Sequence, residues 1–261
     1  MIDAVLFDLG NTLIDFGVSR REAELLFRQG AKLSYHDLRA RGHPHLPAYD
    51  RYLKTHYRIM QRAYIWSRLS GRDFSYETVL ARAAAKLQLN LTDAELRHLA
   101  HVWYQPIMLA SAVDDGVYGM LEQLRAAGTR LGVVSNTIVP PHCLDQHLAD
   151  EGLLEYFPVR VYSCQVRYRK PHPRIFALAL ERIGVPAHRT LFIGDLLKAD
   201  IAGAKKAGMH TIWKPPRTRD GCVPPTPRRH DADAIIDHVT RLTDVLPRFG
   251  WPPSGAPNPA E

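Results

Sequence analysis

Short apolar segments alternate with amphipathic ones along most of the chain. Five such segments, rich in valine, isoleucine and phenylalanine, lie at residues 4–8, 130–136, 159–163, 191–195 and 210–214. Each is too short for a helix and too uniformly apolar for a strand with one face in water, which is typical of parallel strands buried on both faces. Between them, 117–128 and 175–184 have apolar residues at helical spacing and end in glycine. Strands that alternate with single helices predict an α/β fold with a doubly wound parallel sheet.

The connection between the first two predicted strands is unusually long. It spans on the order of a hundred residues, far more than an ordinary crossover, and most of it has helical periodicity. Two helix starts inside it have capping boxes, Ser19 with Glu22 and Thr92 with Glu95. We therefore expect a helical domain at 16–110 that is inserted into a sheet domain. The sheet domain comprises 1–15 and 111–247, ends with a short strand and a helix within 232–246, and is followed by a flexible tail at 248–261.

The charge of the chain is concentrated in this predicted helical insert. The whole chain has a net charge of +7, and residues 16–110 contain 15 of its basic and 8 of its acidic residues, so the insert accounts for the entire excess. One interpretation is a lid whose field attracts an anionic ligand, and the other is an ordinary solvated helical surface. The basic residues are spread over several helices without a recognisable binding motif, so we do not expect a nucleic-acid partner.

Composition narrows the class of protein further. A hydrophobic fraction of 46% with 23% charged residues is ordinary for a globular protein. No apolar run approaches the length of a membrane span, and the N-terminal segment has neither a basic region nor a cleavage site of small residues. The three cysteines, Cys143, Cys164 and Cys222, are far apart and lack metal-site spacing. We expect a cytoplasmic monomer or homodimer with reduced thiols and no membrane partner.

Polar residues close several of the predicted strands. Because the carboxyl ends of parallel strands share one rim, and that rim is where open α/β proteins bind ligands, we expect these residues to meet there. Asp200 follows at the start of a predicted helix, and Lys170 precedes another helix between stiffening prolines. The residues at the strand ends are Asp8, Ser135, Asn136 and Asp195.

Three carboxylates beside one lysine have a definite chemical logic. Crowded carboxylates repel each other unless a divalent cation neutralises them, and an all-oxygen set of ligands suits Mg²⁺. Mg²⁺ commonly shares its coordination sphere with a phosphate, whose other oxygens Lys170 and Ser135 could bind. Asp8 could then attack phosphorus and form an aspartyl-phosphate. The pattern therefore predicts a small, anionic phosphorylated substrate.

Four segments in order, "VLFDLGNTL", "VVSNT", "KPHPRIF" and "GDLLKADIAGAKKAGM", resemble the motifs of the haloacid dehalogenase superfamily of hydrolases. The resemblance extends from residue 2 to about 213 and implies a Rossmann-like core with a helical C1-type cap at the insert. It implies that Asp8 is the nucleophile, Ser135 the phosphate-binding hydroxyl and Lys170 the balancing cation. Asp195 and Asp200 would complete the Mg²⁺ site with Asp8 and the backbone carbonyl of Gly10. Asn11, Thr12 and Asn136 are candidate substrate contacts, with turn formation as the alternative reading.

One position departs from the family pattern. Phosphatases of the family usually have Asp-x-Asp at the first motif, where the second acid protonates the leaving oxygen, and this chain has Gly10 there. Positioned acid–base catalysis supplies about 10² to 10⁴ in rate, so activity can survive its loss, particularly with a good leaving group such as an acyl phosphate or a sugar 1-phosphate. His43 and His45, in a proline-rich loop of the insert, are candidate replacements.

The same departure leaves three other interpretations open. A dehalogenase would attack carbon. A phosphonate-cleaving enzyme would use a lysine of the cap, and Lys32 is a conceivable counterpart of that lysine. A catalytically weakened member of the family could serve as a binding protein. By resemblance, dehalogenases need no metal and generally lack the first acid of the fourth motif. Asp195 therefore favours a Mg²⁺-dependent phosphatase.

Overall fold

The computed structural model describes residues 1–16, 20–43, 45–216 and 231–252. Its centre is a six-stranded sheet with strand order β3-β2-β1-β4-β5-β6, in which all neighbouring strands are parallel. The doubly wound parallel sheet predicted from the sequence is confirmed. The strands are β1 (Ala4–Phe7), β2 (Arg130–Ser135), β3 (Val159–Tyr162), β4 (Thr190–Gly194), β5 (His210–Trp213) and β6 (Ala234–Ile235).

Strand β1 is central and buried on both faces. Ala4 and Leu6 belong to one apolar cluster, whereas Val5 and Phe7 belong to another on the opposite face. Successive side chains of a strand point to opposite faces, so a uniformly apolar segment satisfies both layers at once. Burial of these side chains contributes roughly 25 cal/mol per Å² of apolar surface.

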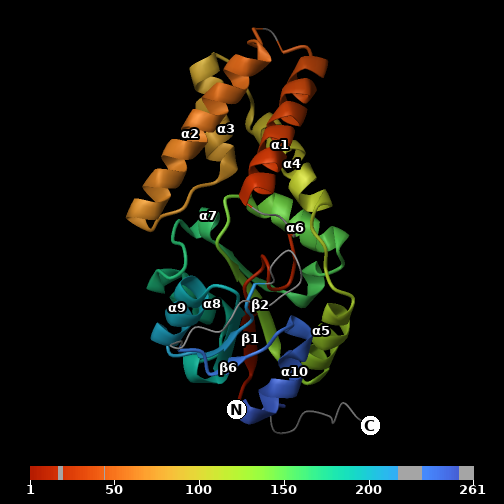
Figure 1. Ribbon diagram of the computed structural model, residues 1–261, viewed down its shortest axis with the longest axis vertical. Helices are drawn as coiled ribbons and strands as arrows, with labels where there is room; N and C mark the ends of the chain where they lie inside the picture. The colour runs from red at the N-terminus through yellow and green to blue at the C-terminus, as the bar shows by residue number, and fades with distance from the viewer. Residues whose placement is uncertain (17–19, 44, 217–230, 253–261) are drawn as a thin grey trace.

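Helices cover both faces of the sheet (Figure 1). Helix α8 packs on β2 and β3. Helices α5 and α10 contact each other, and their buried side chains belong to the apolar cluster on the opposite face. The sequence predicts Asp200 at the start of a helix, and the structure places it inside a π-helical turn, Leu197–Ile201, that precedes the short helix α9 (Ala202–Lys206). The six strands and the helices associated with them are called the sheet layer here. Its helices are α5 (Gly116–Ala126), α6 (Pro141–Asp150), α7 (Ser163–Val166), α8 (Pro173–Ile183), α9 (Ala202–Lys206) and α10 (Leu242–Val245).

Four further helices form a group beyond the carboxyl ends of the strands (Figure 1). They lie between β1 and α5 in the chain, where the sequence predicts the insert, and α1 packs on α4 as α2 packs on α3. Tyr76 and Trp103 stack with ring centroids 3.7 Å apart in their shared core. The helices are α1 (Arg20–Ala40), α2 (Tyr49–Ser70), α3 (Tyr76–Leu87) and α4 (Asp93–Leu109).

The capping prediction for α4 is confirmed. The Thr92 hydroxyl accepts from the Glu95 backbone N–H at 3.3 Å, and the Glu95 carboxylate accepts from the Thr92 N–H at 2.7 Å. This reciprocal pair satisfies two donors that a helix start leaves open. Ser19, the other predicted cap, lies outside the described residues.

Backbone hydrogen bonds join the helical group to the sheet layer at several places. The backbones of Asp15 and Ala112 pair where the chain enters and leaves it. The loop between α2 and α3 also binds the segment before Lys170, since the Asp73 N–H donates to the Arg167 carbonyl at 3.1 Å and the Arg169 N–H donates to the Gly71 carbonyl at 3.2 Å. The second attachment fixes the helices over the rim of the sheet.

The ordered core extends beyond the predicted domain end at 247. Trp251 is buried, and its indole N–H donates to the Thr129 hydroxyl at 2.8 Å, so the start of the predicted flexible tail packs against the sheet domain. Residues 217–230, and 253–261 of the predicted tail, lie outside the described residues. In the described part of the chain, no helix is both long enough and apolar enough to cross a bilayer.

Candidate active site

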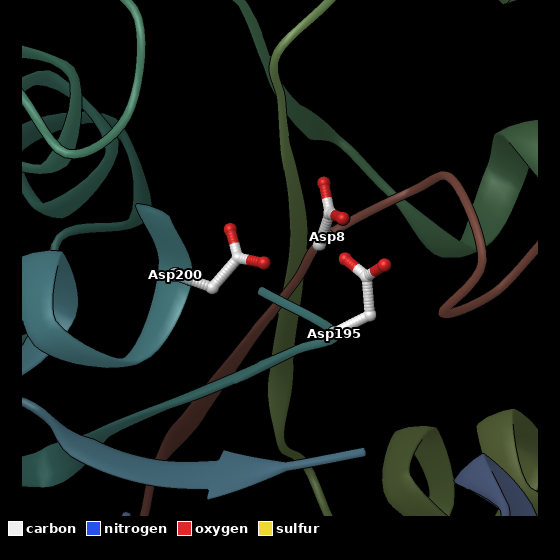
Figure 2. A group of neighbouring side chains, drawn as sticks. All are labelled: Asp8, Asp195 and Asp200. Carbon is white, nitrogen blue, oxygen red and sulfur yellow. The ribbon is translucent and has the colours of Figure 1, made fainter. Parts of the chain in front are cut away.

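Three aspartates converge at the carboxyl rim of the sheet (Figure 2). Asp8 directly follows β1, Asp195 directly follows β4, and Asp200 lies in the turn after it. All three are buried, and one oxygen from each lies within 4.8 Å of the others. The register of the sheet brings Asp8 and Asp195 near each other, because Phe7 pairs with Ile193 and the two aspartates follow these paired residues by one and two positions.

Lys170 is the cation of this cluster. Its side chain is buried, and its Nζ lies 2.6 Å from Asp8 Oδ1 and 2.7 Å from Asp200 Oδ1, and donates to the Val134 carbonyl at 2.8 Å. Burial alone lowers the pKa of a lysine, but here the charges of Asp200 and Asp8 outweigh it and the pKa of Lys170 is raised. The ammonium group therefore stays charged over the whole physiological range.

One lysine does not compensate three buried carboxylates. Burial raises the pKa of Asp8 to about 6, against the lowering effect of the Lys170 charge. Burial, together with the charges of Asp8 and Asp200, raises the pKa of Asp195 to about 8. Without a further cation, proton uptake is the means by which the cluster relieves its negative charge. This set of oxygen ligands and its excess charge fit a divalent cation such as Mg²⁺.

Gly194 makes room for the third carboxylate. A Cβ atom at this position would lie 2.6 Å from the Cβ, Cγ and Oδ2 atoms of Asp200, which is closer than any real contact of this kind. Asp200 Oδ2 in turn accepts from the Leu196 N–H at 2.9 Å, which fixes the carboxyl group. The absence of a side chain at residue 194 is therefore a condition for the cluster.

Asn136 fixes the backbone that carries Lys170. The Lys170 N–H donates to Asn136 Oδ1 at 2.7 Å, and Asn136 Nδ2 donates to the Lys170 carbonyl at 3.0 Å. This paired contact joins the end of β2 to the segment before α8, which are far apart in the sequence. Both polar atoms of the Asn136 amide take part in this contact, so the Asn136 side chain positions Lys170 as well as lining the cavity. Ser135, the last residue of β2, is also buried at this rim.

A cavity of about 470 Å³, here called the catalytic cavity, opens over the three aspartates. It is lined by every candidate residue of the sequence analysis except Thr12 and the alternatives in the insert. Its walls come from both the sheet layer and the helical group. The residues that line it are Asp8, Leu9, Gly10, Asn11, Phe16, Tyr64, Asp73, Tyr104, Ile107, Ser135, Asn136, Thr137, Ile138, Val139, Leu144, Arg169, Lys170, Asp195, Leu196 and Asp200.

Thr12 is not at this surface. The turn after β1 puts Asn11 in the left-handed region, with φ at 55°, and buries the Thr12 side chain, which is 4% exposed. Asn11 remains at the cavity, and its carbonyl accepts from Lys214 Nζ at 2.5 Å. The structure thus favours the turn reading of Thr12 over substrate contact.

The candidate replacements for the missing acid also lie elsewhere. His43 pairs with Glu95, with Nε2 to Oε1 at 2.9 Å, and neither His43 nor His45 lines the catalytic cavity. The connection between α1 and α2 that contains them lies at the end of the helical group remote from the sheet (Figure 1). Lys32 is exposed on α1 and does not line the cavity. Helical periodicity does not predict which way these side chains point, and none of the three reaches the catalytic cavity.

Several residues that line the cavity carried no motif in the sequence. Tyr64 and Asp73 come from α2 and the loop after it, and Tyr104 comes from α4. Helical periodicity does not predict which polar side chain of an insert reaches the rim. Arg169 is different, because it directly precedes Lys170 and could have been suspected from that position.

Comparison with known proteins decides the family. The model of the haloacid dehalogenase-like hydrolases matches residues 2–208. The chain belongs to this family. It is therefore a hydrolase.

Relatives of this hydrolase include proteins named as phosphatases. It is 34% identical to glyceraldehyde 3-phosphate phosphatase of Methanopyrus kandleri over 48% of this chain, a match that spans about half of that protein (53%). It is 33% identical to N-acetylmuramic acid 6-phosphate phosphatase of Pseudomonas aeruginosa over 64% of this chain and 74% of that protein. The crystal structure of a HAD phosphatase from Thermococcus onnurineus superimposes with a TM-score of 0.59 at 26% identity, over 94% of this chain and 98% of that chain.

Proposed function

We propose that this hydrolase is a Mg²⁺-dependent phosphatase that acts on a small phosphorylated metabolite through an aspartyl-phosphate on Asp8. The observation that carries the proposal is the convergence of three buried carboxylates within 4.8 Å beside Lys170 at the floor of a cavity. The phosphatase names of two relatives support it. A bound divalent cation would neutralise the cluster and polarise the phosphoryl oxygens.

Each residue of the cluster has a proposed role. A carboxylate oxygen of Asp8 forms a bond to phosphorus as the bond from phosphorus to the leaving oxygen breaks, and water later cleaves the acyl phosphate and restores Asp8. Lys170 and Ser135 bind the oxygens of the phosphoryl group. Asp8, Asp195, Asp200 and the carbonyl of Gly10 hold the cation. Asn136 keeps the Lys170 backbone in place, and Asn11 contacts the substrate.

Glycine at position 10 bears on the choice of substrate. In the described part of the chain, Asp73 is the one carboxyl group lining the catalytic cavity besides the cluster. Its oxygens already accept from Ser67 Oγ at 3.2 Å and Ser163 Oγ at 2.7 Å. Because no evident acid protonates the leaving oxygen, we propose that the enzyme favours leaving groups that need little protonation, such as those of acyl phosphates or sugar 1-phosphates.

We also propose that the helical group is a C1-type cap, with the domain limits 16–110 given by the sequence. The contribution of Tyr64, Asp73 and Tyr104 to the cavity wall supports this reading. A cap over the rim would exclude water from the reacting phosphoryl group and select the leaving group.

The direct test is phosphate release over a panel of acyl phosphates, sugar phosphates and simple monoesters, with and without Mg²⁺. We expect release that requires Mg²⁺ and that falls by about 10³ or more in Asp8→Asn and Asp195→Asn. Asp115→Asn, at an exposed position that directly precedes α5 and does not line the catalytic cavity, is the matched control and should keep wild-type activity.

Two results would contradict the proposal. Release that is unchanged in Asp8→Asn would remove the nucleophile from its role. No turnover of any ester by folded protein that still binds Mg²⁺ would favour chemistry at carbon, as in a dehalogenase, or a binding role.

A further inference from the structure

The catalytic cavity continues into a second one along the rim. This neighbouring cavity, here called the lateral cavity, has a volume of about 770 Å³. It shares Asn136, Arg169, Lys170, Asp195 and Leu196 with the catalytic cavity. A substrate whose phosphoryl group lies at Asp8 could therefore extend into it.

The lateral cavity is strongly basic. Arg68, Arg169 and Lys198 line it, and Asp195 is its one carboxylate among the described residues. Within the described ranges, none of these three cations has an ion-pair partner within 4.0 Å. The positive charge of this wall is thus not needed to balance the protein's own acids, unlike that of Lys170.

Arg169 is the best-placed of the three cations. It is the one that lines both cavities, and its side chain is half-buried. Its Nη1 donates to Ser67 Oγ at 3.0 Å, and Ser67 Oγ donates to Asp73 Oδ1 at 3.2 Å. This chain of hydrogen bonds from α2 and the loop after it fixes the direction of the guanidinium group.

Most of the hydrogen-bonding capacity of that group is unused. A guanidinium carries five N–H donors in a rigid fork that matches two oxygens of a carboxylate or phosphate. Over the residues that the structure describes, Ser67 Oγ is the one acceptor for the Arg169 side chain. A half-buried cation with a fixed direction and open donors fits an anionic group of the ligand.

We propose that Arg169 binds a second anionic group on the leaving-group side of the substrate, so that the enzyme selects phosphate monoesters that also carry a carboxylate or a second phosphate. This inference rests on the proposed function, since it takes the phosphoryl group to lie at Asp8. Arg68 and Lys198 add to the positive field of the lateral cavity, and Arg169 makes the direct contact.

The test compares matched esters in Arg169→Gln and wild-type protein with Mg²⁺. The esters are 2-phosphoglycolate, ethylene glycol bisphosphate as the second-phosphate arm, and 2-hydroxyethyl phosphate, which is called the neutral ester here because its arm beyond the phosphoryl group is uncharged. A charge-assisted hydrogen bond is worth about 1.5–3 kcal/mol, so kcat/KM for the better doubly anionic ester should fall about 10- to 100-fold in the variant. For the neutral ester kcat/KM should change by less than about threefold, because it has no group for Arg169 to bind.

Arg167→Gln is the control variant. It removes the same charge two residues away, from an exposed side chain that lines neither cavity. Its ratio of activities on anionic and neutral esters should equal that of the wild type. Which doubly anionic ester loses more in Arg169→Gln identifies the second group as carboxylate or phosphate.

Three results would overturn the inference. The first is an equal loss of kcat/KM on the doubly anionic and neutral esters in Arg169→Gln, which would place Arg169 on the transferred phosphoryl group. The second is a wild-type enzyme whose kcat/KM does not depend on the second anion. The third is a loss in Arg167→Gln equal to that in Arg169→Gln. If no ester is hydrolysed, the proposed function fails separately, and calorimetric binding of phosphonoacetate and ethylphosphonate decides the inference. It stands if Arg169→Gln weakens phosphonoacetate binding alone and falls if both or neither are weakened.

Discussion

Asp8 ends a strand that is otherwise entirely apolar. Its carboxyl group is held by Lys170 and by neighbours that the sheet register brings alongside it. A buried carboxylate is costly, and its raised pKa, about 6, reflects that cost. A rigid position at the mouth of the sheet is what a nucleophile needs, so the cost has a functional explanation in the proposed mechanism.

Gly194→Ala tests how closely the acid cluster is packed. The new Cβ would lie 2.6 Å from the Asp200 side chain, which must move. We expect Mg²⁺ binding, measured by calorimetry, to weaken by about tenfold or more. Overpacking should also lower the free energy of unfolding by about 1–3 kcal/mol.

Gly119→Ala is the matched control for this change. It lies on the exposed face of α5, where a Cβ would meet nothing within 4 Å. It should leave Mg²⁺ binding unchanged and stabilise the protein by up to about 1 kcal/mol, because alanine favours a helix over glycine. Equal Mg²⁺ affinity in Gly194→Ala and the wild type would show that Asp200 does not depend on this space.

The sequence was sufficient to predict which charged residues form the acid cluster. Asp8, Lys170, Asp195 and Asp200 stand at strand ends or beside a helix, and the parallel sheet then determines their meeting. Thr12 could not be assigned, because the direction of a turn residue depends on backbone angles that the sequence leaves open.

At the scale of elements, α2 contains a buried histidine. His56 is 2% exposed, and its Nδ1 lies 3.0 Å from the Tyr52 carbonyl. Burial lowers the pKa of His56 to about 4, although the hydrogen bond to Tyr52 acts in the opposite direction. The folded protein therefore keeps this ring neutral while the unfolded chain protonates it near its ordinary pKa of about 6.5.

His56 predicts a loss of stability in mild acid. Between the unfolded and folded pKa values the unfolded state binds more protons, so stability falls as the pH decreases below about 6.5 and levels off below about 4. From pH 7 to pH 5 the contribution of His56 is about 2 kcal/mol of unfolding free energy.

Denaturant titrations of wild type and His56→Phe at the two pH values measure this contribution. The variant should lose about 2 kcal/mol less than the wild type over this range, whatever its stability at pH 7. The same pH dependence in both proteins would mean that His56 is protonated in the folded state.

The elements themselves were predicted with uneven success. The strands were found because burial on both faces makes each uniformly apolar, and α4 because its capping box is explicit. The π-helical turn around Asp200 was not, since its hydrogen bonds serve the cluster and leave no pattern of apolar residues. Trp251 was assigned to a tail because its neighbours are glycine and proline, and its partner Thr129 is remote in the sequence.

At the scale of the whole molecule, the helical group and the sheet layer share one cavity. The group supplies part of the wall, and its sequence carries the excess positive charge of the chain. Arg68 brings some of that charge to the lateral cavity, which Arg169 and Lys198 of the sheet layer also line. Whether the charge of the insert attracts an anionic ligand or only solvates a helical surface stays a prediction to be tested.

Ionic strength should accordingly affect capture more than chemistry. Raising NaCl from about 50 mM to 300 mM shortens the Debye length below 10 Å and should reduce kcat/KM for a doubly anionic ester severalfold, with kcat changing by less than about twofold. Steady-state kinetics with a chromogenic phosphate monoester that has no second anionic group as comparison measures the difference. A kcat/KM that is independent of salt would show that the charge of the insert does not attract the substrate.

The central claim is that Asp8 carries the phosphoryl group during turnover. The most direct measurement is an acid quench of the enzyme with Mg²⁺ and its best ester in the steady state, followed by proteolysis and mass spectrometry of the peptide that contains residue 8. The account predicts one added phosphoryl group on Asp8, absent in Asp8→Asn. Rapid turnover with phosphate on another residue, or with phosphate release undiminished in Asp8→Asn, would contradict it.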